Sequence, residues 1–407
     1  MKKAGDFGRS RCRINNGKTI EKFDSKYLEI DLNEAFSEDG QNKDGDFIIE
    51  QAPKESVSGK RYVKGDMMRF HKGVSDEPDN QDAKYTQDAT YVNIVYTVAT
   101  SILEAEGKSK IDDEDIEEEN VIGVCIPIIE YFSDGKDKLK ENLEGAYVVR
   151  FPALDGKKVS FDLDADNIKV SPEGVIALST VFKDSVSKNI VASGLGAIID
   201  GGYGSLDIAL MEYGRPVGKG ARSFPIGGIT LKSKLESVLE SNNIFASEAN
   251  VESALKHGEV ARGKGEPLPV GEHVQTAKKE LAKMFIASLK KVLIDAGRAD
   301  SELKYFFVMG RCFKTNQLST RESVDQLVEA ATTLVDDASV SDRNESEANA
   351  DKVLAEDPRC TGSLVDYIVD LWKYDVDVLY PIVAEKMDAM EDANAYGLGL
   401  GMFRECK

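Results

Sequence analysis

The chain has 407 residues, 41% of them hydrophobic and 8% aromatic, which predicts two large folded domains and argues against a mainly disordered protein. Its formal net charge of −20 argues against nonspecific binding to bare DNA or to anionic membranes, because like charges repel one another. The five cysteines form no C-x-x-C pair and the three histidines lack ligand-like spacing, so neither a disulfide framework nor a zinc site is predicted.

The N-terminal part of the chain predicts a β-meander, a polar segment and a helix. Three strand-like patterns come first, at residues 3–7, 12–14 and 19–23. Asn15-Asn16-Gly17 is typical of a hairpin turn between the last two strands. Residues 34–90 are polar and rich in Gly, Asp and Lys, with a strand-like patch at 46–49, and we interpret the region of about 30–90 as a small mobile subdomain. Apolar residues spaced by three and four predict a helix over 91–106.

The middle of the chain alternates strand and helix patterns. After an acidic run at 112–119, which we expect to be a solvated loop, strands are predicted at 121–129, 146–151, 158–163, 168–170, 197–200 and 206–213. A second unit is predicted to begin near Pro172, with a helix over 174–182. A long amphipathic helix is predicted over 272–296.

The C-terminal part is predicted to hold a strand, an insertion and three further elements. The strand covers residues 305–309, and the acidic residues 316–357 are typical of an inserted helical hairpin. The elements that follow are a helix at 363–372, a strand at 376–383 and a final helix from about residue 392.

Two segments share one pattern, in which a strand ends in Asp, a turn of small residues follows and a second strand leads away. They are residues 6–10, Asp-Phe-Gly-Arg-Ser, and residues 200–207, which begin Asp-Gly-Gly-Tyr-Gly-Ser. Glycine lets backbone N–H groups approach a phosphate closely, and an Asp at a strand end can hold a hydrated Mg²⁺. Ordinary hairpins with Asp and Gly as turn formers are the alternative. The two turns lie about half the chain apart, which looks like a duplicated module.

The order of the motifs resembles the actin and sugar-kinase ATPase superfamily, and within it the ParM-like bacterial actins. Asp6-x-Gly8 resembles the first phosphate loop, and Arg13 stands where actins place a basic phosphate contact. Ser171-Pro172-Glu173-Gly174 resembles the first interdomain connection, where this family carries its catalytic glutamate or glutamine. A Pro-Glu pair that merely starts a helix is the alternative for Glu173.

The second half of the chain continues this resemblance. The segment 200–207 is similar to the second phosphate loop, and Gly227-Gly228 resembles the glycine pair that follows it in ParM-like proteins. Ala393-Asn394-Ala395-Tyr396-Gly397 matches the second connection. For the adenosine loop we favour the segment around Gly310, which keeps only one of the usual glycines, and Thr361-Gly362-Ser363 is its rival.

The resemblance implies an α/β, actin-like fold with two RNase H-like domains. Each domain would contain a mixed five-stranded sheet flanked by helices, with a nucleotide cleft between the domains. Domain I is predicted as residues 1–171 plus 391–407, and domain II as residues 172–390 with its insertion at 316–357.

The resemblance also implies the site residues. Glu173 and Asp200 would be catalytic, and Asp6 and Asp200 would hold Mg²⁺. The nucleotide, ATP with GTP as the alternative, would be bound by Asp6, Gly8, Arg9, Ser10, Arg13, Gly201, Gly202, Tyr203, Gly204, Ser205, Gly228, Lys256, Gly310 and Arg311.

The function that this resemblance implies is a polymerising ATPase. ATP-bound subunits would assemble head-to-tail into filaments, and hydrolysis would destabilise them. The expected use is plasmid segregation through a ParR-like DNA-binding adaptor on a centromere-like site, since the acidic chain is not expected to bind DNA itself. A non-polymerising small-molecule kinase of the same superfamily, or a protein that holds nucleotide without turnover, is the alternative. Because no apolar run reaches membrane-spanning length, we expect a cytoplasmic protein without a membrane partner.

Overall fold

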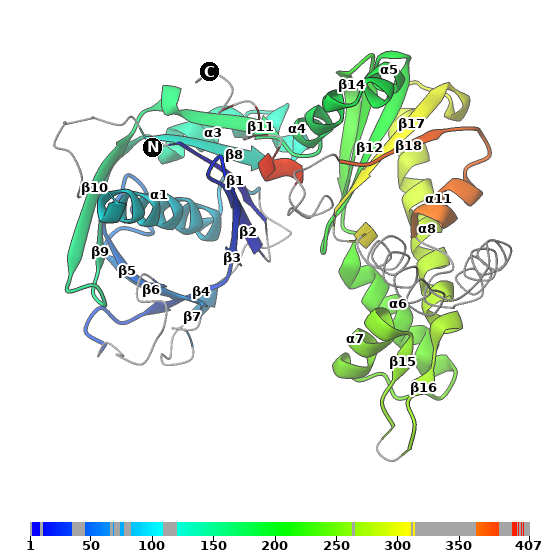
Figure 1. Cartoon of the computed structure of the whole chain (residues 1–407), viewed down its shortest axis with the longest axis horizontal. Coiled ribbons are helices and arrows are strands. Elements are labelled where there is room, and N and C mark those ends of the chain that lie inside the picture. Colours follow the sequence, from blue (N-terminus) through cyan, green and yellow to red (C-terminus); the bar gives the residue numbers. More distant parts are fainter. Residues whose placement is uncertain are drawn as a thin grey trace, which may run out of the picture. The chain divides into compact units, whose positions relative to one another are not determined.

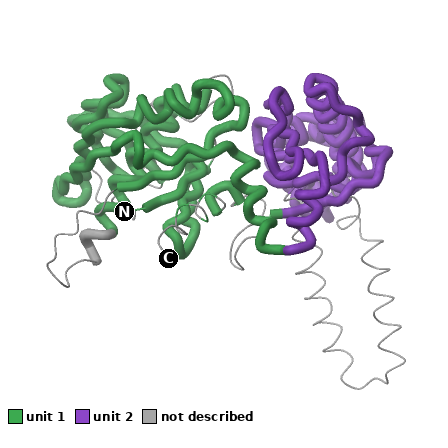
Figure 2. The backbone as a smooth tube through the Cα atoms, turned by 90° about the horizontal axis from the view of Figure 1, so that it is seen from above, with its two compact units in different colours: residues 1–184, 381–407 green, residues 185–380 purple. Residues whose placement is uncertain are grey.

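The computed structural model divides into two compact units, residues 1–184 with 381–407 and residues 185–380 (Figure 2). The residues it describes are 2–8, 11–34, 45–65, 68, 74–76, 83–108, 120–262, 265–310, 312–313, 364–381, 393–396, 398, 400 and 402. The predicted acidic loop at 112–119 and the predicted insertion at 316–357 therefore lie outside the described residues. We call the two units unit 1 and unit 2 and describe each by itself.

Unit 1 contains a five-stranded mixed sheet in the order β11-β8-β1-β2-β3. Its strands are β1 (Lys2–Phe7), β2 (Arg11–Asn15), β3 (Ile20–Asp24), β8 (Val121–Ile126) and β11 (Ile168–Pro172). The first three form the predicted antiparallel meander, while β8 and β11 run parallel to β1. Both faces of β8 are buried, which explains its continuous apolar pattern.

Alternate residues of β8 face two different helices. Ile122 and Val124 belong to the main core of unit 1, together with residues of α1 (Asp88–Lys108). Val121 and Cys125 pack instead against Leu398 and Met402 of the C-terminal segment. Residues 393–396 of that segment are helical, in agreement with the predicted final helix.

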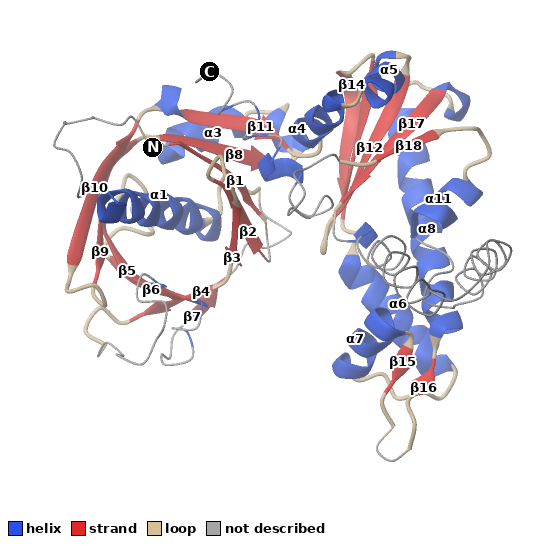
Figure 3. Cartoon of the chain, viewed as in Figure 1, coloured by secondary structure: helices blue, strands red, loops and turns tan. Residues whose placement is uncertain are grey.

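A six-stranded sheet in the order β10-β9-β5-β6-β4-β7 covers the other side of α1 (Figures 1 and 3). Its strands are β4 (Tyr27–Ile30), β5 (Asp46–Gln51), β6 (Lys60–Lys64), β7 (Val74–Asp76), β9 (Gly145–Phe151) and β10 (Lys157–Leu163). The sequence predicted β5, β9 and β10 but not β4, β6 or β7. In β6, Arg61 and Lys64 are buried, and these two charged residues interrupt the apolar pattern by which a strand is predicted.

Short helices connect the strands of unit 1. They are α2 (Ile128–Tyr131), α3 (Gly135–Leu143), η3 (Ala165–Asn167), α4 (Val175–Leu178) and η4 (Ser179–Lys183). The predicted strand at 121–129 was wrong at its end, because Pro127 follows the last strand residue and is the N-cap of α2. The predicted helix at 174–182 consists of α4 and η4.

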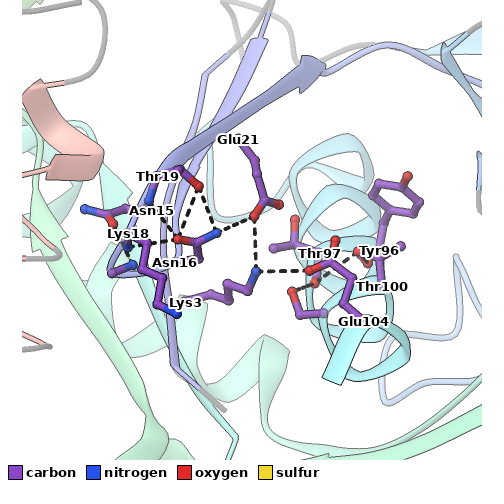
Figure 4. Close-up of polar contacts among 12 residues, drawn as sticks. Lys3, Asn15, Asn16, Lys18, Thr19, Glu21, Tyr96, Thr97, Thr100 and Glu104 are labelled. Carbon is purple, nitrogen blue, oxygen red and sulfur yellow. Dashed lines mark hydrogen bonds and ion pairs between the residues drawn. The ribbon is translucent and has the colours of Figure 1, made fainter. Parts of the chain in front are cut away.

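Polar side chains fix the β2–β3 turn of unit 1. Asn16 donates to Glu21 Oε1 at 2.6 Å, and Lys3 Nζ lies 3.5 Å from the same oxygen. Figure 4 shows Lys3 reaching from β1 toward Glu21 and toward Glu104 of α1, whose Oε2 is 3.8 Å away. These contacts hold the turn end of the meander against α1, and the opposite end of the meander carries the Asp6 turn.

Unit 2 repeats the strand order and strand directions of the first sheet, with β14-β13-β12-β17-β18. Its strands are β12 (Leu195–Gly201), β13 (Leu206–Glu212), β14 (Arg215–Phe224), β17 (Leu303–Met309) and β18 (Asp377–Leu379). The first three are antiparallel neighbours, and β17 and β18 continue in parallel from β12. The prediction of two mixed five-stranded sheets is confirmed, and the shared topology agrees with a duplicated module.

Helices flank this second sheet. They are α5 (Ser185–Ala192), α6 (Gly228–Ser241), α7 (Glu248–His257), α8 (Gly271–Asp295), η5 (Asp300–Glu302) and α11 (Leu364–Leu371), with a small hairpin of β15 (Glu259–Val260) and β16 (Leu268–Pro269). The helix α8 is amphipathic, as predicted for residues 272–296, and its buried face includes Val274, Leu281, Phe285, Leu289 and Val292.

Candidate functional site

The Asp6 turn, which we call loop 1 (residues 6–10), follows the central strand of the first sheet. Asp6 is buried, and the register pairs it with Arg13 on β2. A Cβ on Gly8 would lie 2.8 Å from the Arg11 carbonyl oxygen and 3.2 Å from Arg13 Nη1, so only glycine fits there. Ser25, which directly follows β3, donates a hydrogen bond from its hydroxyl to the Gly8 carbonyl. Arg9 and Ser10, which the sequence assigned to the nucleotide, lie outside the described residues.

Two cations and two carboxylates meet beside loop 1. Arg13 Nη1 lies 3.7 Å from Asp6 Oδ2, and Lys84 Nζ lies 3.7 Å from Asp6 Oδ1. Lys84 Nζ also donates to Glu173 Oε1 at 2.5 Å. Burial by itself would lower the pKa of Lys84, but the negative charges of Glu173 and Asp6 outweigh it and raise the pKa above its ordinary value. Lys84 therefore remains an ammonium that joins the two predicted site carboxylates.

Sequence reasoning missed Lys84. It lies in the turn before α1, within the polar region, and nothing in its neighbours distinguishes it from a surface lysine. Its backbone N–H donates to Glu130 Oε1 at 3.0 Å, which fixes the turn against the α2 segment. Only the tertiary structure brings it to Asp6 and Glu173.

The two predicted connections are joined directly in unit 1. Glu173 follows β11, and its N–H donates to the Ile126 carbonyl at 2.8 Å. Gly174 has φ +70°, a conformation that favours glycine, and its N–H donates to Asn394 Oδ1 at 2.8 Å. The predicted second connection therefore caps the predicted first one. Asn15 of β2 in turn donates to the Ala395 carbonyl at 3.3 Å.

The Asp200 turn, which we call loop 2 (residues 200–207), occupies the corresponding position after the central strand of unit 2. Gly202 N–H donates to the Ser205 carbonyl at 2.8 Å, which closes the turn. Ser205 Oγ donates to Asp207 Oδ2 at 3.0 Å, and Asp207 is the register partner of Asp200. Loop 2 therefore places two carboxylates on neighbouring strands beside a closed turn of small residues.

The start of α6 packs directly on loop 2. The N–H groups of Gly228 and Ile229 donate to the carbonyls of Gly202 and Tyr203 at 3.1 and 2.9 Å. A Cβ on Gly227 would lie 2.6 Å from the Tyr203 carbonyl oxygen, so this close approach needs glycine. The Gly227-Gly228 pair thus joins the helix to loop 2.

The segment after β17 also contacts loop 2. Gly310 has φ +99°, and a Cβ there would lie 2.5 Å from both Asp200 Oδ1 and the Gly201 carbonyl oxygen. Cys312, which sequence reasoning did not single out, donates its thiol to the Gly202 carbonyl at 3.0 Å. The favoured adenosine-loop segment is therefore adjacent to loop 2. Arg311 and the rival segment 361–363 lie outside the described residues.

Lys256, which was predicted to contact the nucleotide, makes none of the contacts described for loop 2. Lys256 is exposed in the last turn of α7. Lys232 of α6 lies closer to loop 2, with Nζ 5.8 Å from the centroid of the Tyr203 ring. It also donates to Glu252 Oε1 at 3.0 Å. In this structure Lys232 is the better candidate for a basic contact beside loop 2.

The donor set fits a magnesium ion of the kind that accompanies a nucleotide. Mg²⁺ is usually held by one or two carboxylates, several waters and the substrate phosphates. Asp200 and Asp207 offer two carboxylates on paired strands, and the described residues contain no cluster of three or more metal-ligating side chains. Asp6 already has two cations beside it, Arg13 and Lys84, which makes its carboxylate a weaker ligand for direct coordination of a metal ion.

Comparison with known proteins places the fold. No family model and no curated protein matches the chain. The archaeal actin homologue Ta0583 is 16% identical, with 100% of this chain and 99% of that chain covered and a TM-score of 0.60. The chain has an actin-like fold of the ParM type. Alp7A, an actin-like protein, is 13% identical with coverage of 100% and 96% and a TM-score of 0.58. ParM of a 15-stranded filament from Clostridium botulinum is 13% identical, with 99% of each chain covered and a TM-score of 0.57.

These similarities concern the fold alone, and they extend over nearly the whole length of this chain. One structure of Ta0583 is a complex with ADP, with 16% identity and a TM-score of 0.57. In the described part of the chain, no helix combines the length and the apolar character needed to cross a bilayer.

Proposed function

We propose that the chain is a nucleotide-dependent polymerising ATPase whose loops 1 and 2 bind the phosphates of ATP. One observation carries this proposal: the two five-stranded sheets have the same topology, and each ends its central strand in an Asp-x-Gly turn with an adjoining polar cluster. Chance hairpins have no reason to occupy the same topological position in two sheets. The ADP complex of a similar structure supports a nucleotide as the ligand.

The proposed chemistry is the attack of water on the γ-phosphorus. The bond from phosphorus to the β,γ-bridging oxygen breaks, ADP leaves, and the water proton passes to a carboxylate or a phosphate oxygen. Glu173 would orient the water, because its carboxylate is held in place by Lys84 and by its own backbone hydrogen bond. Lys84 and Arg13 would neutralise phosphate charge beside loop 1. Asp6 and Asp200 would hold Mg²⁺, as the resemblance implies, and the ion would supply charge neutralisation on the phosphates.

The biological setting belongs to the same proposal. Residues 1–171 plus 391–407 and residues 172–390 would be the two actin-like domains, and cytoplasmic subunits would assemble head-to-tail. A filament of ParM is among the similar structures, which supports self-assembly as the use of the fold. Because the chain carries a net charge of −20, a basic DNA-binding adaptor of the ParR kind would make any contact with a plasmid site.

Phosphate release and nucleotide binding test the proposal together. Wild type should release phosphate from Mg-ATP, whereas Glu173→Ala should bind ATP with similar affinity and release phosphate at least 100-fold more slowly. Equal release rates would show that Glu173 has no catalytic role. Turnover that appears only after a small-molecule acceptor is added would indicate a kinase instead.

A further inference from the structure

A buried cluster of polar groups supports loop 1 from the interior of unit 1. Ser25 lies between β3 and β4 and is fully buried, and its hydroxyl donates a hydrogen bond to the carbonyl of Gly8. Cys12 Sγ lies 3.4 Å from the same hydroxyl oxygen. A serine hydroxyl has one hydrogen, and the carbonyl oxygen takes it, so the thiol of Cys12 is the donor to Ser25. Loop 1 is therefore fixed on its inner side by a hydroxyl that belongs to another turn.

The hydrogen bond from Ser25 determines how loop 1 presents its backbone. The peptide bond after Gly8 precedes an arginine, and peptide bonds before residues other than proline are trans, with C=O and N–H on opposite sides. A Gly8 carbonyl that faces Ser25 turns the N–H side of this peptide unit away from the interior. Outward N–H groups are what a phosphate binds in a glycine-containing loop. The hydroxyl thus favours the backbone orientation that phosphate binding at loop 1 requires.

The turn that carries Ser25 is itself held by a buried ammonium from a distant strand. Lys64 is the last residue of β6, and its Nζ donates to the carbonyls of Asp24, at 3.0 Å, and Lys26, at 3.4 Å. Asn93 of α1 accepts from Lys64 Nζ at 2.5 Å through Oδ1 and donates to the Ser25 carbonyl at 2.9 Å through Nδ2. Lys64 and Asn93 together fix the turn that presents the Ser25 hydroxyl to loop 1.

An ammonium at this position costs stability. Lys64 is only 3% exposed, and burial lowers its pKa to about 8, which the nearby charge of Asp24 opposes only in part. The fold therefore bears a cost for keeping a cation at this point. Positions of this kind, where a buried group has a strongly shifted pKa, are typical of functional sites.

We propose that Lys64 is a positioning residue for loop 1. Its ammonium fixes the turn after β3, the Ser25 hydroxyl holds the Gly8 carbonyl inward, and loop 1 is thereby shaped for phosphate before a nucleotide binds. Lys64 and Ser25 act through loop 1 and not by contact with the nucleotide. This inference rests on the proposed function for the identity of the ligand, and it adds a residue outside the phosphate loops that sets the affinity for that ligand.

Nucleotide affinity then depends on pH. An ammonium has three N–H donors, whereas the neutral amine has two and no charge, so deprotonation of Lys64 loosens the turn and with it loop 1. Affinity is highest below about pH 7.5 and falls as the pH rises through about 8. The stability of the fold changes in the opposite direction, because the folded-state pKa of Lys64 is lowered. These opposite signs distinguish a positioning role from a stabilising one.

The titratable side chains that face Lys64 come from four elements. They are Cys12 on β2, Asp24 on β3, Tyr27 on β4 and Tyr96 on α1. Burial raises the pKa of Cys12 and of Tyr27 above their ordinary values, so the thiol and the phenol stay neutral between about pH 7 and 9. The change in this window therefore belongs to Lys64.

Proton uptake on nucleotide binding measures this coupling. If protonation of Lys64 raises affinity about 10-fold, binding raises its pKa from about 8 to about 9. Wild type should then take up about 0.5 proton per Mg-ADP bound at pH 8.5, and its affinity should fall about sixfold between pH 7.5 and 9.5. Titration calorimetry in two buffers of different ionisation enthalpy counts the protons. Lys64→Met should take up about 0.5 proton fewer than wild type, and its affinity should change less than about twofold over this range.

A second variant breaks the link between the turn and loop 1 while it leaves the lysine in place. Ser25→Ala should weaken Mg-ADP binding about 10-fold at pH 7.5 and reduce proton uptake at pH 8.5 to less than about 0.2. The matched control is Ser101→Ala on α1, since Ser101 is also buried and donates to the Thr97 carbonyl at 2.6 Å. This control should bind Mg-ADP and take up protons like wild type. Circular dichroism shows that each variant is folded.

Hydrogen exchange without nucleotide tests the link to loop 1 separately. The backbone amides of residues 4–14 should exchange at least about threefold faster in Ser25→Ala and in Lys64→Met than in wild type at pH 7.5. Exchange of the same residues in Ser101→Ala should match wild type. This measurement needs no ligand, so it stands apart from the proposed function.

The outcomes separate this inference from the proposed function. If wild type binds Mg-ADP, and Ser25→Ala and Lys64→Met keep its affinity and its proton uptake, the positioning role is overturned while the proposed function stands. Faster exchange in these two variants, in a wild type that binds no nucleotide, supports the link to loop 1 and refutes the proposed ligand. A loss of affinity in Ser101→Ala equal to that in Ser25→Ala would also overturn the positioning role, because any softening of unit 1 would then have the same effect.

Discussion

Lys84 provides the sharpest test of the site geometry. Its ammonium is held between Glu173, at 2.5 Å, and Asp6, at 3.7 Å. Replacement by Met keeps most of the side-chain volume but removes the charge. Glu173 then loses the ammonium of Lys84, while Asp6 keeps Arg13 at 3.7 Å. The damage should therefore concentrate on Glu173.

The expected magnitude follows from burial. The side chains of Lys84 and Glu173 are only 10% and 15% exposed. Removing one partner of a buried ion pair costs about 3–5 kcal/mol, and we expect about 3 kcal/mol for Lys84→Met because Glu173 retains some access to water. Glu173→Gln should cost less, about 1–2 kcal/mol, since Lys84 still has Asp6. The double variant should be more stable than the sum of the two losses predicts, by about 2 kcal/mol.

Denaturant unfolding of the four proteins measures this coupling. Circular dichroism reports both units, whereas the single tryptophan, Trp372, reports unit 2 and provides an internal reference. The midpoint of the unit 1 transition should shift in the single variants and partly recover in the double variant. Losses that add to within 0.5 kcal/mol would refute the ion pair.

Two further predictions concern a buried lysine and a strained glycine. Burial lowers the pKa of Lys64 from 10.5 to about 8, so the unfolded chain binds a proton more tightly than the folded chain between these values, and stability rises with pH in that window. Relative to Lys64→Met, wild type should gain about 2 kcal/mol in unfolding free energy between about pH 7.5 and 9.5; a difference that does not change with pH would contradict this. Gly310→Ala should destabilise unit 2 by about 2 kcal/mol more than Gly297→Ala and weaken ATP binding, because both positions have positive φ but only a Cβ on Gly310 meets loop 2. Equal losses of stability in the two glycine variants would show that loop 2 adapts to the added methyl group.

The sequence predicted the parts of the site that local patterns encode. Asp6, Gly8 and the turn at 200–207 appear as strand ends followed by small residues, and the structure places them at equivalent positions in two equivalent sheets. The resemblance also identified the Glu173 segment and the Asn394 segment as the two connections, and in the structure the Gly174–Asn394 hydrogen bond joins them. Such features are visible in a sequence because the backbone conformation itself requires particular residue types.

What the sequence concealed depends on partners that lie far apart along the chain. Lys84 looks like a surface lysine until Glu173, 89 residues away, supplies its counter-charge. The strand β6 was missed because Arg61 is buried against Asp46, 15 residues away, and Lys64 against Asn93, 29 residues away. A local pattern treats such charges as exposed, whereas the folded chain compensates them.

The central claim is that ATP drives this chain into a polymer that its own hydrolysis destabilises. Pelleting of wild type with Mg-ATP, with a non-hydrolysable ATP analogue and with ADP, followed by electron microscopy of the pellets, measures it directly. We predict filaments that persist with the analogue, that disassemble with ATP as phosphate is released, and that do not form with ADP at the same concentration. The absence of polymer in all three conditions, in protein shown to bind the nucleotides, would contradict the claim.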